Sequence, residues 1–307
     1  MLPRLASGQA PALFPVEIVT VQHPEHGQRR LVRDPALYRL RCDTLAQPRF
    51  WQAVMRLSPD SALVNIADVR RILAVVSLPG YDTLTAERKR DFKDSLRDRY
   101  DLDCAASLYV TGGKNHFYRF RDAIPVIDES VPVFLEEGVN PWYAQAILLI
   151  ESPGQTLRSE KGAYGSFQLM KSVAISMGLT VNKTVDERKD PVKSARAAAR
   201  FLSRVCIPEA EAIVARHGLA WNRDDLWFRL LVLHVYHAGA ANVSGAVGVI
   251  RPAQGDFGLI RTLWRTEYGG FKNASQNYSQ LALASLLTLD AMIATECEFV
   301  CEPAANP

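Results

Sequence analysis

Long apolar runs are missing from this sequence of 307 residues. No stretch of 18 apolar residues occurs, so no transmembrane helix is predicted. Residues 1–6 (MLPRLA) lack the apolar core of a signal peptide, so none is predicted either. If the protein works outside the cytoplasm, it is therefore exported by another route or has lost a leader.

An excess of charge of one sign is also missing. The net charge is +3, which favours an anionic polymer only weakly, and no clustered basic face of the kind that binds nucleic acid stands out. The densest charge run, between residues 87 and 99, mixes both signs. We interpret it as the solvated face of a helix and expect no nucleic-acid partner.

Cysteines are few, at five, and a chain of this length needs no disulfide framework. Cys297 and Cys301 are four residues apart, which on a helix places both on one face. No second pair or nearby histidine completes a zinc site. Buried free thiols, or one disulfide if the protein is exported, are both compatible with this pattern.

Signatures of metal and nucleotide sites are absent as well. His234 and His237 could share a helix face, but a metal ion would need a further ligand. Lys114 follows two glycines, yet Leu108 stands where a phosphate-binding loop requires glycine. We therefore predict no metal and no cofactor.

Strand-like alternation is scarce, and the sequence predicts a mainly α protein. A short strand or extended segment is expected at 108–111. The expected helices lie at 50–57, 66–76, 85–100, 142–151, 192–205, 226–238 and 279–294. We divide the chain into a smaller, mostly helical N-terminal region (1–120), a catalytic domain (121–296) and a tail (297–307), and leave the role of the first region open.

One helix carries a carboxyl group in an unusual place. Ala144, Ile147, Leu148 and Glu151 lie on one face of the 142–151 helix, and only Glu151 is polar. Partial burial favours the protonated form of a carboxylic acid, as a general acid for glycosidic cleavage requires. Pro153 disfavours helix at the residue before it, so Glu151 should border a loop. Taken alone, a terminal glutamate is more often exposed or paired.

The segment 162–170 (GAYGSFQLM) begins 11 residues after Glu151. Gly162 and Gly165 permit tight turns close to a ligand. Gln168 can hydrogen-bond a sugar hydroxyl or amide with both ends of its side chain. Phe167 and Met170 offer apolar surface to a sugar ring or to the core.

Together these residues resemble the soluble-type (SLT) lytic transglycosylases, whose pattern is Glu-Ser followed by Gly-Ala-x-Gly-Leu-x-Gln. Two further family elements follow in order, at 235–239 (VYHAG) and at Asn277-Tyr278. The segment 186–190 (DERKD) is similar to the membrane-bound lytic transglycosylase D branch. The resemblance covers roughly residues 120–292.

The resemblance implies a lysozyme-like fold of the α+β lysozyme superfamily and cleavage of peptidoglycan strands in the periplasm or cell envelope. The bond broken would be the β-1,4 link between N-acetylmuramic acid and N-acetylglucosamine, with a 1,6-anhydro product and Glu151 as acid and base. A lysozyme-like hydrolase and a non-catalytic glycan-binding module are the alternatives. The implied substrate-binding residues are Ser152, Gly165, Phe167, Gln168, Met170, Tyr236, His237 and Tyr278.

Two positions depart from the family pattern. Ser166 replaces the usual leucine, which we expect to change local packing only. His237 replaces the asparagine that lines the glycan cleft in the family. A histidine still donates or accepts a hydrogen bond and adds a titration near neutral pH. This departure bears on sugar specificity and pH optimum more than on the reaction.

Overall fold

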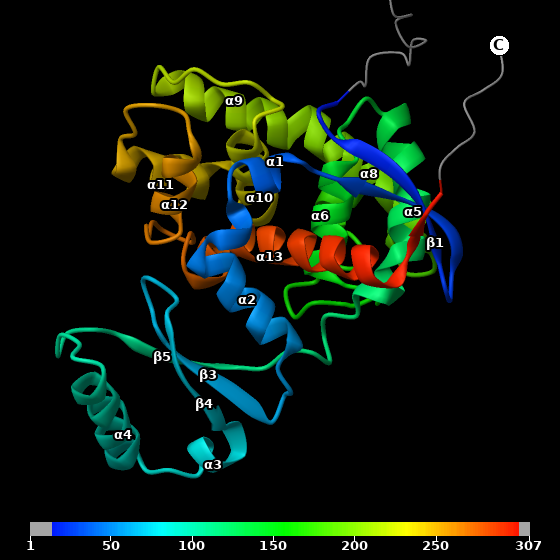
Figure 1. The fold of residues 1–307 in the computed structure, drawn as a ribbon. Helices are drawn as coiled ribbons and strands as arrows, with labels where there is room; N and C mark the ends of the chain where they lie inside the picture. Colours follow the sequence, from blue (N-terminus) through cyan, green and yellow to red (C-terminus); the bar gives the residue numbers. More distant parts are fainter. Residues whose placement is uncertain (1–13, 301–307) are drawn as a thin grey trace, which may run out of the picture.

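The computed structural model describes residues 14–300, and Figure 1 numbers its elements along the chain. The helices are α1 (Ala36–Arg39), α2 (Ala46–Arg56), α3 (Leu78–Asp82), α4 (Ala86–Arg99), α5 (Phe120–Glu136), α6 (Trp142–Glu151), α7 (Lys171–Ser176), α8 (Pro191–Phe201), α9 (Ile207–Arg216), α10 (Leu226–Ala238), α11 (Ala240–Ile250), α12 (Phe257–Leu263) and α13 (Asn273–Glu296). Short turns of other helix types are η1 (Cys42–Thr44), η2 (Glu187–Lys189) and the π-helical η3 (Leu202–Cys206). The strands are β1 (Glu17–His23), β2 (Gly27–Arg33), β3 (Ser61–Ile66), β4 (Ile72–Ser77), β5 (Leu108–Gly112) and β6 (Glu298–Phe299). Helices dominate, so the predicted mainly α class is confirmed.

Helix α6 lies inside the helical body, where it packs against α5, α8, α10 and α13. All nine residues before Glu151 are buried, because the sequence WYAQAILLI is apolar except for Gln145. A helix that is apolar all round belongs in a core. The apolar surface of α6 is thus wider than the single stripe predicted, and only its last residue, Glu151, reaches solvent in part.

The N-terminal hairpin and α2 belong to this same core. Strands β1 and β2 pair antiparallel, and β2 packs on α5 and α6 while α2 packs on α13. The backbone N–H of Val32 donates to Gln145 Oε1 at 2.9 Å, and Gln145 Nε2 donates back to the Val32 carbonyl at 2.6 Å. Asp34 forms a buried ion pair with Arg229 of α10 at 3.0 Å. Residues that precede position 57 therefore help to hold α6 and α10 in place.

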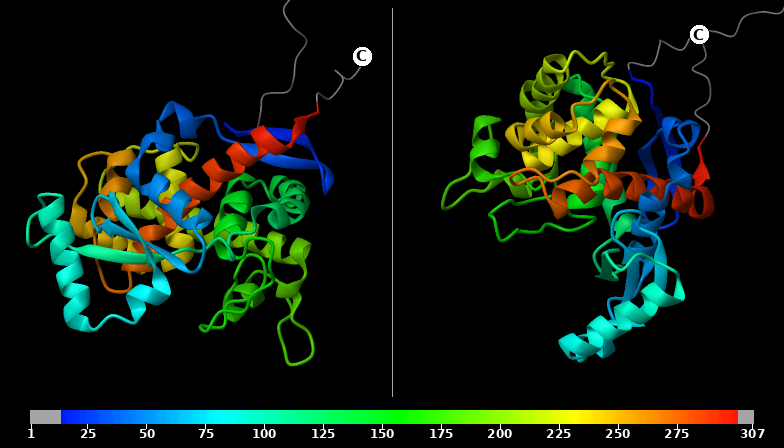
Figure 2. Two further views of the ribbon diagram at one scale, coloured as in Figure 1. Left: turned by 60° about the horizontal axis from the view of Figure 1, so that its bottom comes forward. Right: turned by 90° about the vertical axis from the view of Figure 1, so that its left-hand side faces the viewer.

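Residues 61–112 form a separate projection, here called the small lobe, which Figures 1 and 2 show extending from the helical body. Its sheet has the order β4-β3-β5, and α4 lies beside it over a small core of Val64, Leu73, Leu96 and Leu108. The lobe is fixed to the end of α2, since the N–H of Lys114 donates to the Val54 carbonyl at 3.0 Å. A Cβ on Gly113 would lie 2.2 Å from the Ser58 carbonyl oxygen, so this close approach requires glycine.

The helices predicted at 50–57, 85–100, 142–151 and 226–238 and the strand at 108–111 are confirmed, apart from shifts of a few residues at their ends. The helix predicted at 192–205 is also found, as α8 continued by the π-helical turn η3. Helix α13 begins six residues before the predicted 279. The helix predicted at 66–76 is wrong. That segment is the end of β3, a turn, and β4, which pair antiparallel from Ser61 opposite Ser77. Its apolar residues repeat at three and four, but they are mostly β-branched, and Arg70 has a left-handed backbone (φ 56°) that breaks the helix.

The two predicted boundaries fare differently. The boundary near residue 120 stays a prediction, although the shared core groups residues 16–63 with the helices that follow 118. Helix α13 ends at Glu296, so Cys297 does not lie on its face as predicted, and Cys301 falls outside the described residues. Strand β6 then pairs with β1. Within residues 14–300, no helix has the length and apolar character needed to cross a membrane.

Candidate active site

Glu151 ends α6 because Ser152 turns away from the helix (φ −156°) ahead of Pro153. Its side chain is 20% exposed. Two cavities, of about 930 and 550 Å³, meet at this carboxyl group, and Glu151, His237, Asn273 and Ala274 line both. Glu151 is the only acidic residue that lines either cavity. The chain therefore carries one carboxyl group in the middle of a long cleft.

Two rings from other helices hold this carboxyl group. Tyr278 of α13 donates its hydroxyl to Glu151 Oε1 at 2.8 Å. His237, near the end of α10, stacks on the Tyr278 ring with centroids 4.3 Å apart, and its Nδ1 lies 3.9 Å from Glu151 Oε1. Burial, followed by the charge of Glu151, raises the pKa of Tyr278 well above its usual value. The phenol therefore stays protonated and acts as a donor.

Tyr236 serves the wall of the cleft. Its hydroxyl donates to the Phe167 carbonyl at 2.7 Å, which ties α10 to the loop that follows α6. Burial and the nearby charge of Glu151 raise the pKa of Tyr236 as well. The predicted pair of tyrosines around Glu151 thus divides its work: Tyr278 contacts the carboxyl group and Tyr236 fixes the loop.

The loop between α6 and α7 is held by its own backbone. Gln168 has a left-handed backbone (φ 46°), and its Nε2 donates to the carbonyls of Leu157 at 2.8 Å and Gly165 at 2.9 Å. Its amide oxygen remains as the acceptor for a ligand. Gln168 and Met170, which is 43% exposed, line the smaller cavity.

Two of the predicted substrate contacts need correction. Phe167 is fully buried and stacks on Phe134, so its ring belongs to the core and cannot reach a sugar. Ser152 is 2% exposed and donates its hydroxyl to the Ser166 carbonyl at 2.7 Å, so it fixes the loop. Gly165 is also buried, and its role is one of close packing. A Cβ there would lie 2.0 Å from the Arg188 carbonyl oxygen.

Sequence reasoning missed Arg188 as an organiser of this loop. The residue is 2% exposed, pairs with Asp186 at 2.8 Å, and donates from Nη1 to the carbonyls of Gly162 and Leu169. The family-like segment 186–190 contains it, but no local pattern says that its partners are backbone carbonyls about 20 residues away.

The histidine pair of α10 does not form a metal site. His234 is fully buried and faces the ring of Phe271, and burial lowers its pKa to about 3. Across residues 14–300, no group of three metal-ligating side chains gathers.

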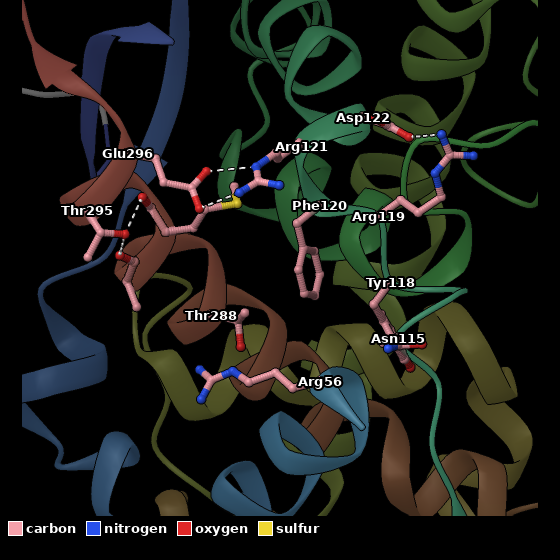
Figure 3. A pocket seen from close by; sticks show the side chains of 12 residues that line it. Arg56, Asn115, Tyr118, Arg119, Phe120, Arg121, Asp122, Thr288, Thr295 and Glu296 are labelled. Carbon is pink, nitrogen blue, oxygen red and sulfur yellow. Dashed lines mark hydrogen bonds and ion pairs between the residues drawn. The ribbon is translucent and has the colours of Figure 1, made fainter. Parts of the chain in front are cut away.

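A third cavity, of about 600 Å³, lies between the start of α5 and the end of α13 (Figure 3). Its acidic residues are already engaged. Glu296 accepts two hydrogen bonds from Arg121, at 2.7 and 2.8 Å, and Asp122 pairs with Arg119. This cavity therefore offers no free carboxyl group for acid–base chemistry.

Residues 135–248 match the family model described as the transglycosylase SLT domain. The chain contains a transglycosylase SLT domain. The match confirms the family predicted from the motifs, and it takes in Glu151, the loop and His237. Tyr278 and the small lobe lie outside the matched segment of the SLT domain.

Among solved structures, the chain is similar to an inactive mutant of the lytic transglycosylase Slt from Pseudomonas aeruginosa, with 19% identity and a TM-score of 0.38. The similarity covers 54% of this chain and 24% of that one, so the chain matches about a quarter of the length of Slt. No significant match was found among curated proteins.

Proposed function

We propose that the protein is a peptidoglycan lytic transglycosylase. It would cleave the β-1,4 bond between N-acetylmuramic acid and N-acetylglucosamine and leave a 1,6-anhydromuramic end. The observation that carries the proposal is the lone carboxyl group of Glu151 in the cleft of an SLT domain. A glycosidase that uses water or a covalent intermediate needs a second carboxyl group about 5–9.5 Å away. When the substrate supplies its own nucleophile, one carboxyl group is sufficient.

In this mechanism Glu151 acts twice. As an acid it gives its proton to the glycosidic oxygen that leaves. As a carboxylate it then takes the proton of the muramic C6 hydroxyl, which attacks the anomeric carbon and closes the anhydro ring. No water is consumed, so the reaction is a lyase reaction. General acid–base catalysis supplies roughly 10²–10⁴-fold, and positioning of the sugar supplies much of the rest.

Tyr278 and His237 position this group. The Tyr278 hydroxyl fixes one oxygen of Glu151, which leaves the other free to face the glycosidic bond. His237 stands beside the same oxygen and, stacked on Tyr278, holds that ring in place. We place Gln168 and Met170 along the bound glycan, since they line the cavity on the other side of the carboxyl group. The substrate implies a site of action in the periplasm or cell envelope.

The test is digestion of purified peptidoglycan sacculi, with soluble fragments analysed by mass spectrometry. The wild type should release anhydro-muropeptides. Glu151→Gln should release none while its thermal unfolding stays unchanged. Glu160→Gln is the matched control, because Glu160 is an exposed glutamate of the same loop that lines neither cavity, and it should retain full activity.

Other products decide against the proposal. Reducing ends from the wild type would make the protein a hydrolase. Binding to sacculi without any cleavage would make it a glycan-binding module.

A further inference from the structure

The small lobe forms the second wall of the larger cavity. Tyr109 and Lys93 of this lobe line the same 930 Å³ space as Glu151 and Tyr278. Trp51 of α2 and Lys114, just after the lobe, continue the wall. None of these wall residues lies in the segment that matches the SLT domain, so the wall is an addition to that domain.

Arg70 is the most enclosed charge in this wall. It is 9% exposed and lies over the rings of Phe50, Trp51 and Tyr109, with 5.1–5.9 Å between the guanidinium carbon and the ring centroids. Its Nη2 donates to Asn277 Oδ1 at 2.9 Å, beside the tyrosine that holds Glu151.

No carboxylate of residues 14–300 forms an ion pair with Arg70. Its Nη1 donates to the neutral Asn65 side chain at 3.3 Å, and Asp68 acts on it only from a distance. A buried guanidinium without an anionic partner is unfavourable, and stacking on aromatic faces offsets only part of that penalty. The site has spare capacity to bind an anion.

The other cations of the wall are also unpaired. Lys93 is half-buried and Lys114 exposed, and neither forms an ion pair within the described part of the chain. Glu151 is the only acid that lines this cavity. The cavity of Figure 3 differs, because there Arg119 and Arg121 are each matched by a carboxylate. The excess positive charge is therefore a property of the catalytic cleft.

We propose that this wall, formed by Arg70, Lys93 and Lys114, binds the carboxylates of the peptide stems that the muramic residues of the strand carry. The inference rests on the proposed function. The sugars of the strand are neutral, so cations give nothing to the glycan itself, whereas the short peptides end in carboxylates. Arginine binds a carboxylate through two parallel hydrogen bonds, and the exposed Tyr109 ring offers apolar surface to the peptide. The small lobe thus selects strands that still carry acidic peptides.

The experiment compares two substrates that differ in charge only. One is soluble glycan strands with intact stems. The other is the same strands after their carboxylates have been converted to carboxamides with carbodiimide and ammonia. Initial rates give KM and kcat, and retention on native or amidated sacculi gives binding.

For the wild type, amidation should raise KM about 10-fold with little change in kcat. The double variant Lys93→Gln/Lys114→Gln should raise KM by about the same factor on native strands, roughly 3-fold for each positive charge removed, and should have no effect on amidated strands. Arg70→Gln should act in the same direction. Should it be unstable, the two lysine changes, which leave the buried core untouched, carry the test.

Arg88→Gln is the matched control, since it removes one positive charge from an exposed position of α4 outside the cavity and should change neither constant. Equal KM values for native and amidated strands, in wild type and variants alike, would overturn the inference and leave the proposed function standing. Charge-dependent binding without cleavage of either substrate would remove the proposed function and keep carboxylate binding. Neither cleavage nor charge-dependent binding would remove both.

Discussion

A single hydroxyl group connects α13 to the reacting centre. Tyr278 Oη donates to Glu151 Oε1, and burial keeps this phenol protonated through the pH range in which an enzyme works. We expect Tyr278→Phe to lower kcat about 10- to 100-fold, because a hydrogen bond to a charged group is worth roughly 1.5–3 kcal/mol. The ring and its stacking on His237 remain, so the thermal unfolding midpoint should change little. Steady-state kinetics and calorimetry measure the two effects.

The control for this change is Tyr268→Phe, which removes a hydroxyl from an exposed tyrosine that lines neither cavity of the cleft. It should leave kcat unchanged. If Tyr278→Phe kept the full wild-type rate, the hydroxyl would have no part in positioning Glu151.

Sequence reasoning found Glu151, Tyr278 and His237 because they sit in motifs whose order along the chain is distinctive. It could not find Arg70, whose partner Asn277 is 207 residues away and whose charge has meaning only in a cavity between two lobes. Phe167 was assigned to the substrate because its neighbours in the motif line the cleft. Its own side chain points into the core, and no periodicity in a loop reports that difference.

At the scale of elements, the loop between α6 and α7 depends on two glycines that differ in surroundings. Both have positive φ, 86° at Gly162 and 82° at Gly165. A Cβ on Gly162 meets nothing within 4 Å, whereas a Cβ on Gly165 would lie 2.0 Å from the Arg188 carbonyl oxygen.

Gly162→Ala should therefore lower the free energy of unfolding by only about 1–2 kcal/mol, the usual penalty for a left-handed alanine. Gly165→Ala should destabilise more and should reduce activity strongly, since the loop has to move away from Arg188 and takes Gln168 and Met170 with it. Urea unfolding and the sacculus assay compare the pair. Equal losses of stability and activity in both variants would show that the close contact with Arg188 is unimportant.

The elements themselves were predictable where local signals agreed. Helices α6 and α10 have continuous apolar sequences, a Pro141 or Asp225 start and a clear stop at Ser152 or Gly239. The hairpin β3–β4 was mistaken for a helix, because its apolar spacing fits both structures. Pairing across the hairpin decides between the two, and single-residue propensities do not describe pairing.

At the scale of the whole molecule, the N-terminal segment is part of the framework that holds the catalytic helices. Asp34 and Arg229 are each 1% exposed and pair at 3.0 Å, and the guanidinium lies 4.6 Å from the centre of the Trp142 ring. A sequence read in order cannot foresee this arrangement. The segment lies more than 100 residues before its partners, and its composition suits an independent accessory region equally well.

Arg229→Met should lower the free energy of unfolding by about 3–5 kcal/mol, because it leaves Asp34 charged and buried without its partner. Adding Asp34→Asn to Arg229→Met should recover part of the loss, with a coupling energy of roughly 0.5–3 kcal/mol. Arg30→Met is the matched control: it breaks the exposed pair of β2 with Asp128 of α5 and should change stability by no more than about 1 kcal/mol. Denaturant unfolding of the four proteins measures these differences. If Arg229→Met proved no more harmful than Arg30→Met, the N-terminal segment would be an appendage, and the catalytic helices would hold their places without it.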